Sequence, residues 1–463
     1  MFQPPVIQVR TVNSLFTQFI AFNTSNNPSS EANAEYKPDV CIYEKKQGMP
    51  TRPFTSFQTM EMFVEFKHGA SADPFVTEDR FFPKLFNNTC DVRGQIVLYA
   101  TLQQAYQFRT SIFSIGIFGK IARLFRWDRT GCQVTAPIEY STDEGNCQLT
   151  EFFLRLDQMV DDPEGRGWDG TVKDATGKES SDFAAVISAE YERMTKPERR
   201  RTRGQIKAAN RITMDPLSLN LVESIGDASR YMRRIVTVPY GKKKRDYIVG
   251  RPTLIPKSPT GRATRGFVAV AVRTKRIVFL KDNWRPDVGG IKPEDHWYRL
   301  LQQTRKHSEG LKKIGSYSHG SDLYATGKSA RCSDNLQRTT THLYARDHGR
   351  DDAMIGYIHH RVVQSELYLP LDTCRNSRHF VHVMWDILLG GSVSQSNVFA
   401  CLKLILFSAV EHMHNLGIFH RDISIWNIMI DIYGNGRLID LDMARLKDNT
   451  GARQNFRTVS DIF

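Results

Sequence analysis

One short segment near the C-terminus constrains the fold of this chain more than any other feature of its sequence. Residues 420–427 read HRDISIWN, and a second aspartate, Asp440, follows Asp422 by eighteen residues, at the end of an apolar run. Four fixed residue types at these positions match by chance at one site with odds on the order of one in 10⁵. The flanking residues predict a helix that ends near Gly417 and a hairpin that turns at Gly434–Gly436, so that loops held by strands carry both aspartates.

Two carboxylates and an amide at this spacing suit the transfer of a phosphoryl group, which depends on positioning and charge neutralisation more than on covalent help. In that interpretation Asp422 accepts the proton of a substrate hydroxyl and Asn427 turns back to hold a magnesium ion. Asp440 holds magnesium that bridges the nucleotide phosphates. The structural alternative is that both aspartates only cap the turns of a hairpin.

Residues upstream supply further groups that a nucleotide phosphate chain needs. Lys281 follows four apolar residues in the predicted strand Arg276–Asp282, where its ammonium could contact the α- and β-phosphates. Gly261–Gly266 could form a loop over the phosphates, although alanine stands in place of its middle glycine. A solvated strand lysine and an ordinary small-residue turn are the plain alternatives. The order of these segments and their distance from Asp422 favour the phosphate-binding interpretation.

Taken together, these segments resemble the protein kinases, and in particular the fungal-type protein kinase family. The resemblance rests on GRATRGFVAV, VFLKDNWRP, and IFHRDISIWNIM followed by LIDLDMA, all within residues 250–445. The segments RLFRWDRTGCQVT and LTEFFLR extend it over roughly residues 38–450. It implies an α+β fold with a bilobal, protein kinase-like domain. It also implies ATP-dependent phosphorylation of serine or threonine in a protein substrate, with ATP and Mg²⁺ as cofactors.

The resemblance assigns roles to individual residues. It implies that Asp422 is the catalytic base, that Asn427 and Asp440 are metal ligands, that Lys281 contacts the phosphates of ATP, and that the loop from Gly261 to Gly266 covers them. Ser424 stands where ordinary serine/threonine kinases place a lysine that touches the transferring phosphate, so it is assigned to the ATP site as well. Asp442 replaces the glycine that usually follows the metal-binding aspartate by two positions, and the family tolerates this change.

The acidic residue that should pair with Lys281 is ambiguous in the sequence. Glu294 and Asp295 lie in the predicted helical segment IKPEDHWYRLLQQ, but His296 falls at the expected position. Glu309 is another candidate.

The chain also ends soon after Asp440, with only 23 residues to follow. A kinase needs an activation segment and several more helices beyond this point. We therefore expect a C-terminal lobe that is incomplete, and a truncated product, a gene model that ends early and an inactive relative are all compatible with it.

A second candidate site lies in the first half of the chain. Asp39 opens a predicted strand, Glu65-Phe66-Lys67 closes another, and Gln95 and Tyr99 follow on a predicted helix. This order resembles nucleases of the restriction-endonuclease-like fold, in which Asp39 and Glu65 would hold Mg²⁺ and Lys67 would position the attacking water. The triplet Glu-x-Lys is very common, so from sequence alone we favour a pair of surface salt bridges on an edge strand.

The net charge of +13, from 63 basic and 50 acidic residues, is concentrated in two runs. Residues 194–207 and 231–246 each hold six Lys or Arg and one acidic residue, and so supply +10 of the total. Concentrated runs suit solvated linkers better than a nucleic-acid-binding face, which spreads basic residues over a domain. Weak contact with nucleic acid through residues 196–207 and 233–245, or a nuclear-import signal, is the functional alternative.

Cysteine usage and hydropathy favour an intracellular protein. The seven cysteines are scattered and odd in number, and no pair is spaced Cys-x-x-Cys, which indicates a reducing compartment. The most apolar stretch, Ile112–Phe118, is far shorter than the about 20 residues that a membrane span needs. The first residues lack the basic start and apolar core of a signal peptide. We expect a cytoplasmic or nuclear protein that is not secreted and has no membrane contact.

We therefore divide the chain into four parts. They are an irregular segment (1–35), an α/β domain (36–160) with helices predicted at Gly94–Phe113 and Leu149–Val160, a basic linker region (161–245) and the incomplete kinase-like domain (246–463). A protein kinase is the leading hypothesis for function. The alternatives are a nuclease-like or nucleic-acid-binding protein that acts through the N-terminal domain, and an inactive pseudokinase scaffold.

Overall fold

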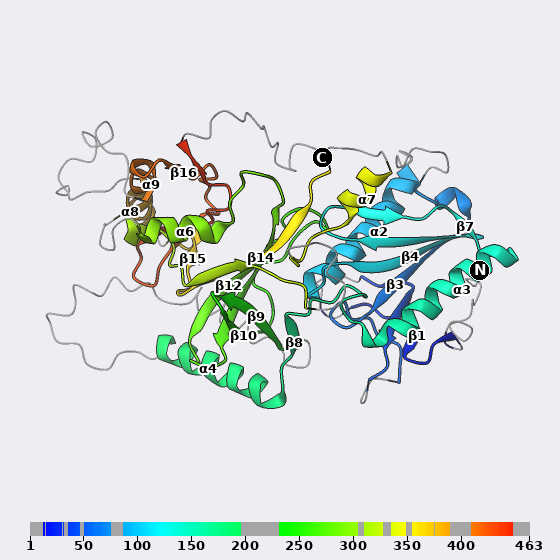
Figure 1. Ribbon diagram of the computed structural model, residues 1–463. Helices are drawn as coiled ribbons and strands as arrows, with labels where there is room; N and C mark the ends of the chain where they lie inside the picture. Colours follow the sequence, from blue (N-terminus) through cyan, green and yellow to red (C-terminus); the bar gives the residue numbers. More distant parts are fainter. Residues whose placement is uncertain are drawn as a thin grey trace, which may run out of the picture.

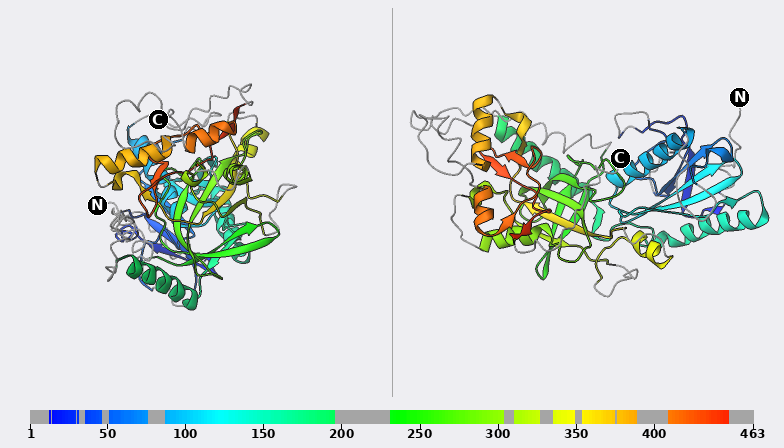
Figure 2. Two further views of the ribbon diagram at one scale, coloured as in Figure 1. Left: turned by 90° about the vertical axis from the view of Figure 1, so that its left-hand side faces the viewer. Right: turned by 90° about the horizontal axis from the view of Figure 1, so that it is seen from above.

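Two large β-sheets, each with its own helices, lie side by side in the computed structural model (Figure 1). The structure describes residues 13, 15–29, 31, 36–46, 51–75, 87–195, 231–303, 310–326, 335–348, 354–374, 376–388 and 409–447. The first sheet forms an N-terminal unit. The second sheet and the C-terminal helices form a second unit beside it, which gives the molecule an elongated shape (Figure 2).

The N-terminal unit is built on a mixed sheet in the order β1-β2-β3-β4-β5-β6, with β7 paired to β5. Its strands are β1 (Phe19–Asn23), β2 (Val40–Glu44), β3 (Met62–Lys67), β4 (Ile112–Phe118), β5 (Ile121–Trp127), β6 (Cys132–Val134) and β7 (Ile138–Glu139). β1, β2 and β3 pair antiparallel, whereas β3 and β4 run parallel. A parallel pair needs a long crossover, and helix α2 (Asn87–Tyr106) lies within it.

Helices cover both faces of this first sheet. Side chains of successive strand residues point to opposite faces, so Phe63 joins the core under α2 and Val64 joins the core under α3 (Asp143–Gln158). Thr142 caps α3, because its hydroxyl accepts a hydrogen bond from the Gly145 amide at 3.1 Å. Short 3-10 turns flank these helices at η1 (Ala70–Ala72) and η2 (Met159–Asp161).

The predicted helix Gly94–Phe113 has the right type but the wrong bounds. The helix begins at Asn87 and ends at Tyr106, and residues 112 and 113 already belong to β4. The chain leaves the helix because Arg109 turns inward to a buried ion pair, with its Nη1 2.9 Å from Glu61 Oε1. The Thr110 amide then donates to the Gly167 carbonyl at 2.8 Å. These tertiary bonds leave no local signal in the sequence.

The second sheet has the order β13-β14-β12-β11-β10-β9-β8. Its strands are β8 (Val172–Asp174), β9 (Arg234–Tyr240), β10 (Lys243–Val249), β11 (Arg265–Ala271), β12 (Ile277–Pro286), β13 (His319–Asp322) and β14 (Tyr357–Gln364). Helix α4 (Gly177–Thr195) packs on one face through Phe183 and Ile187. It begins with a reciprocal cap between Thr176 and Glu179. Helix α6 (Glu294–Gln303), the turn η4 (Leu311–Lys313) and helix α7 (Thr341–Asp347) lie between later strands.

The second basic run is not a linker. It forms the β9–β10 hairpin, in which Ile235, Val236 and Val238 are fully buried and Lys242 to Arg245 are exposed at and after the turn. The apolar residues of this strand are few and lie between two groups of basic residues, so the composition of the run suggested a linker. The second globular unit thus begins before residue 246, and residues 172–195 of the expected linker belong to it as β8 and α4. The first basic run, residues 196–207, lies outside the described residues.

The remaining elements follow the second sheet in the chain. They are β15 (Leu369–Pro370), η5 (Leu371–Thr373), α8 (Ser377–Leu388), α9 (Ala409–Asn415), β16 (Ile418–Phe419), β17 (Ile428–Ile430), β18 (Gly436–Leu438) and β19 (Arg445–Leu446). One core joins α6 to α8 and α9 through Leu301, Val383 and Met413. The predicted hairpin is present as β17 and β18, with Gly434 at a φ of 89° in its turn.

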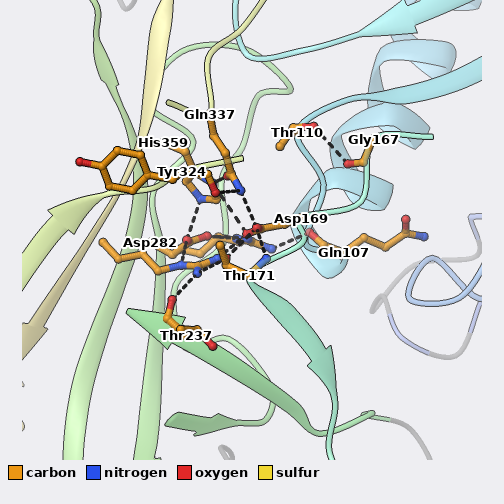
Figure 3. A network of polar contacts seen from close by, with 12 residues as sticks. Gln107, Thr110, Gly167, Asp169, Thr171, Thr237, Asp282, Tyr324, Gln337 and His359 are labelled. Atoms are coloured by element: carbon orange, nitrogen blue, oxygen red, sulfur yellow. Dashed lines mark hydrogen bonds and ion pairs between the residues drawn. The ribbon is translucent and has the colours of Figure 1, made fainter. Parts of the chain in front are cut away.

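A buried polar network joins the two units (Figure 3). Asp282 of β12 accepts from Arg361 at 2.7 Å and from His359 at 2.8 Å, and it also pairs with Arg265. Arg361 reaches on to Asp169 at 2.6 Å, in the segment after the N-terminal unit. The backbone completes the connection, because Arg265 donates to the Gln107 carbonyl at the end of α2 at 2.6 Å. Charges this deeply buried require each of these partners.

Candidate active site

The HRDISIWN segment forms a loop between β16 and β17, and its own side chains hold its shape. The Asn427 amide donates to the Asp422 carbonyl at 2.8 Å and to its carboxylate at 3.0 Å. His420 Nε2 donates to the Ile439 carbonyl at 2.9 Å, while its Nδ1 accepts from the Asp422 amide at 3.3 Å. Burial lowers the pKa of His420, which agrees with a neutral ring that donates at one nitrogen and accepts at the other. Ser424 is half-buried, and its backbone carbonyl accepts a hydrogen bond from the backbone N–H of Asn427.

Asp440 follows β18 directly and faces the second sheet. Its φ is +65°, in the left-handed region that few non-glycine residues adopt. Its carboxylate lies 2.6 Å from Lys281 Nζ. Burial works against the charge of Asp440, but the Lys281 ammonium outweighs it and lowers the pKa of Asp440 below its usual range. The loop and the strand lysine are 159 residues apart in sequence, and the fold brings them into direct contact.

Glu294 is the acidic partner of Lys281, which the sequence left ambiguous. Its Oε2 lies 2.8 Å from Lys281 Nζ, and its Oε1 accepts from the Leu441 amide at 3.3 Å. Glu294 lies in the first turn of α6, two residues before His296. The position expected for the partner was therefore wrong by two residues. Glu309 lies outside the described residues.

Arg262 and Asp442, to which the sequence assigned no chemical role, also belong to this group of charged residues. Arg262 Nη1 lies 2.5 Å from Asp442 Oδ2, and Lys281 Nζ lies 3.7 Å from the same oxygen. Burial and the neighbouring charge of Asp440 raise the pKa of Asp442 above its usual range. The signal for Asp442 was its place two residues after Asp440. Arg262 is 180 residues from Asp442, so no sequence spacing could identify it.

The segment Gly261–Gly266 reaches the neighbourhood of Lys281, but its glycine amides are already bonded. Gly266 pairs with Lys281 across β11 and β12, and its amide donates to the Leu254 carbonyl at 3.0 Å. The Gly261 amide donates to the Arg129 carbonyl of the N-terminal unit at 2.8 Å. In the structure these glycines therefore offer no free amide for a phosphate. This differs from a loop whose backbone covers the phosphates.

This group of residues fits a magnesium–nucleotide complex in its donor chemistry. Asp442 Oδ1 is buried without a hydrogen-bond partner, which leaves an oxygen available for a cation. Oxygen donors of carboxylates and amides are the ligands that Mg²⁺ takes, usually together with water and phosphate oxygens. Among the described residues, no group of three or more His, Cys, Asp or Glu side chains could hold a metal ion. Water and phosphate would therefore have to complete the coordination.

The second predicted cluster is also assembled, at the point where β2, β3 and α2 meet. Lys67 Nζ lies 2.6 Å from Glu65 Oε1 and 2.7 Å from Gln95 Oε1. The Asp39 carboxylate accepts from the Phe66 amide at 2.8 Å, and the Gln95 amide donates to the Tyr99 hydroxyl at 2.9 Å.

The interpretation favoured from sequence, surface salt bridges on an edge strand, is wrong. β3 lies between β2 and β4, and Glu65 is only 2% exposed. Its Oε2 is buried with no hydrogen-bond partner. Burial, and then the charge of Asp39, raises the pKa of Glu65 to about 7. A buried carboxylate with one oxygen unsatisfied, beside a second carboxylate, is a costly arrangement that calls for a ligand or a proton.

Comparisons with known proteins agree with the geometry of the second unit. Residues 333–460 match the protein kinase domain family. Over 114 residues the chain is 35% identical to a negative regulator of sexual conjugation and meiosis from Schizosaccharomyces pombe, covering 23% of each protein. Over 88 residues it is 33% identical to a probable serine/threonine-protein kinase from Dictyostelium discoideum, covering 19% of this chain and 18% of the other. The matches thus span about a fifth of the length of these relatives.

Solved structures give weaker likenesses. The ROP18 kinase domain in complex with AMP-PNP and sucrose is 14% identical, over 60% of this chain and 69% of that one, with a TM-score of 0.24. ROP2 from Toxoplasma gondii, a virulence factor with a protein-kinase fold and no enzymatic activity, is 13% identical, over 58% and 66%, with a TM-score of 0.26. Scores of this size carry no weight for the assignment. The family match over residues 333–460 and the curated relatives support a protein kinase-like assignment for this part of the chain, and the second unit has a mixed α+β fold.

Proposed function

We propose that the chain is an ATP- and magnesium-dependent protein kinase that phosphorylates serine or threonine in a protein substrate. The observation that carries this proposal is the contact of Lys281 with both Glu294 and Asp440, beside the loop of Asp422 and Asn427. These groups come from a strand, a helix and two loops, and phosphoryl transfer requires all of them in one cleft.

Each residue has a role that its contacts support. Glu294 orients the Lys281 ammonium toward the α- and β-phosphates of ATP. Asp440 and Asn427 would hold magnesium, which would neutralise phosphate charge. The Asp422 carboxylate accepts the proton of the substrate hydroxyl, and the Asn427 amide keeps it oriented at 3.0 Å. Ser424 lies in the same loop, in place of a lysine that would touch the transferring phosphate.

The finer parts of the assignment belong to this proposal as well. We propose that the chain is of the fungal-type protein kinase family, because HRDIS followed by LIDLDMA resembles that family. We propose a kinase-like domain that begins near β8 and an N-terminal domain that precedes it, in a cytoplasmic or nuclear protein. The segment after Lys447, on which the expected incomplete lobe depends, lies outside the described residues. No helix in the described part of the chain is long and apolar enough to cross a membrane.

Phosphotransfer from ATP to a generic acceptor protein tests this function. We expect Asp422→Ala to lower the rate by about 10²- to 10⁴-fold, the usual contribution of a general base. Asp372→Ala, outside the cleft, is the matched control and should retain the wild-type rate. If the wild-type chain binds ATP but transfers no phosphate, the pseudokinase scaffold is the correct interpretation.

A second candidate function is favoured by the buried cluster of Asp39, Glu65 and Lys67. We propose that it is a magnesium-dependent phosphodiesterase site of the restriction-endonuclease-like type. The three strands β1 to β3, the crossover α2 and the parallel β4 support this, because they bring both carboxylates and the lysine to one place. Asp39 and Glu65 would hold the metal, and Lys67 would position the attacking water.

Cleavage of linear and plasmid DNA with Mg²⁺ or Mn²⁺ tests this second function. The wild-type chain should cleave, and Glu65→Gln and Lys67→Ala should not. Lys120→Ala, at an exposed lysine in the turn between β4 and β5, should behave as the wild type. Salt-dependent DNA binding without cleavage would instead indicate a nuclease-like fold that is used only for binding.

A further inference from the structure

The segment between β10 and β11, residues 250–264, brings the side chain of Arg262 to the proposed site. Its Nη1 lies 2.5 Å from Asp442 Oδ2, and the same carboxylate oxygen is 3.7 Å from Lys281 Nζ. The arginine and the lysine are therefore close neighbours on one side of the aspartates. In the proposed kinase, the phosphates of ATP would occupy the space that Lys281 faces.

We propose that Arg262 contacts the phosphate chain of ATP in place of a glycine-rich backbone, and that the N-terminal unit positions it for this contact. The inference rests on the proposed kinase function and adds to it a residue that no part of the HRDISIWN and Asp440 pattern identifies. The guanidinium offers a planar fork of donors that fits two phosphate oxygens at once.

The backbone of the segment cannot serve this purpose in the observed structure. The Gly261 amide is engaged by the Arg129 carbonyl and the Gly266 amide by the Leu254 carbonyl. A buried amide that gave up such a bond would have to be compensated by the phosphate. By contrast, the Arg262 side chain is 36% exposed, so an incoming anion can reach it.

Two fixed points hold the backbone on either side of the Arg262 side chain. The Arg262 carbonyl accepts from the Trp284 amide of β12 at 2.8 Å, which continues the ladder beyond β11. One residue earlier, Gly261 is held by Arg129, at the turn between β5 and β6 of the N-terminal unit. Gly261 has a φ of +84°, which suits glycine and lets the chain turn sharply here.

The side chain of Arg129 is buried and binds this segment to the N-terminal unit. It is 1% exposed, and its guanidinium donates to the Pro259 carbonyl at 3.1 Å and to the Gln104 carbonyl of α2 at 3.2 Å. It therefore ties the segment to the N-terminal unit at two successive points, Pro259 and Gly261. A shift of the N-terminal unit would move Arg262 relative to Lys281, and this couples the two units through the proposed nucleotide site.

Titration of the purified full chain with ATP and with adenosine, both in Mg²⁺, tests the proposal. Adenosine lacks phosphates, so it reports the integrity of the rest of the site. We expect Arg262→Ala to weaken ATP binding by about tenfold or more, because a hydrogen bond to a charged group is lost, and to leave adenosine binding unchanged. Arg262→Lys should restore part of the affinity for ATP. Lys257→Ala, at an exposed lysine in the same segment, is the control and should leave the binding of both ligands unchanged.

The outcomes separate this inference from the proposed function. If the wild-type chain binds no ATP, both fail. If ATP binding depends on Lys281 but is unchanged in Arg262→Ala, only the present inference fails. Tighter ATP binding by Arg262→Ala would also overturn it, because Arg262 would then block the site.

The positioning role has its own test in Arg129→Lys. This variant keeps the charge but loses the guanidinium hydrogen bonds to the Pro259 and Gln104 carbonyls. We expect a selective loss of ATP affinity over adenosine affinity. An equal loss of both, or no loss, would contradict positioning by the N-terminal unit.

Discussion

At the scale of single residues, the cleft depends on one ammonium that is shared among several carboxylates. Lys281 is 7% exposed and contacts Glu294, Asp440 and Asp442. Burial disfavours its charge, but the three carboxylates outweigh this and raise the pKa of Lys281 well above its ordinary value. The lysine therefore stays charged over the physiological pH range and is ready for the phosphates of a nucleotide.

Glu294→Gln tests whether this arrangement matters for the nucleotide. The substitution keeps the shape of the side chain but removes the charge that orients Lys281 from α6. We expect the affinity for MgATP to fall by about tenfold, which is the usual order for one charge-assisted hydrogen bond. Isothermal titration of the variant measures this. Gln302→Ala, exposed on the same helix, is the control, and equal affinities in all three proteins would contradict the role of Glu294.

The residues that sequence could and could not identify differ in how local their signals are. Asp422, Asn427 and Asp440 lie within 19 consecutive positions, so a fixed spacing was enough to single them out, and their catalytic roles stay predictions. Arg262 and its partner Asp442 meet only in the tertiary structure. The burial of Glu65 was equally invisible, because a Glu-x-Lys triplet looks the same on an edge strand and on an inner one.

At the scale of elements, the β9–β10 hairpin shows how charge can conceal a strand. Its apolar residues are few and lie between two groups of basic residues, so composition suggested a linker. In the structure, Val236 and Val238 join the core that also holds Phe108, at the end of α2. The hairpin thus links the second sheet to the N-terminal unit rather than spacing them apart.

Unfolding by urea can separate the two interpretations of this hairpin. Val238→Ala should lower the free energy of unfolding by about 1–3 kcal/mol, because a fully buried side chain is truncated. Lys243→Ala, exposed on the same hairpin, should change it by no more than about 0.5 kcal/mol. A negligible effect of Val238→Ala would mean that the hairpin is not part of the core.

At the scale of the whole molecule, the network of Figure 3 makes one structure of two units. Asp282 adjoins Lys281 in β12, and Asp169 adjoins the N-terminal unit, so Arg361 spans the boundary between them. Arg361 is fully buried, and both carboxylates depend on it.

Arg361→Met should destabilise the chain by about 3–5 kcal/mol, since it removes the buried positive charge that Asp169 and Asp282 share. Chemical denaturation measures the loss, and the exposed Arg273→Met is the control. A loss below about 1 kcal/mol would mean that the network does not hold the units together.

The same network predicts how stability depends on pH. Burial acts to raise the pKa of Asp169, but the charge of Arg361 outweighs it and lowers this pKa below its usual value. Burial acts on Asp282 in the same way, and the charges of His359, Arg265 and Arg361 lower its pKa well below the usual value. A carboxylate with a lowered pKa contributes stability above its unfolded value and loses it as the pH falls toward its folded value. Thermal unfolding should therefore occur at lower temperature as the pH drops below about 4. This acid dependence should shrink in Arg361→Met, and an unchanged dependence would assign it to other groups.

The most direct measurement of the central claim is magnesium-dependent binding of ATP by the purified chain. We expect saturable binding that requires Mg²⁺, is lost in Lys281→Ala, and is retained in Lys275→Ala, a lysine at the turn before the same strand. Absence of ATP binding in the wild-type chain, or binding that is indifferent to Lys281, would contradict the assignment of this cleft to a nucleotide.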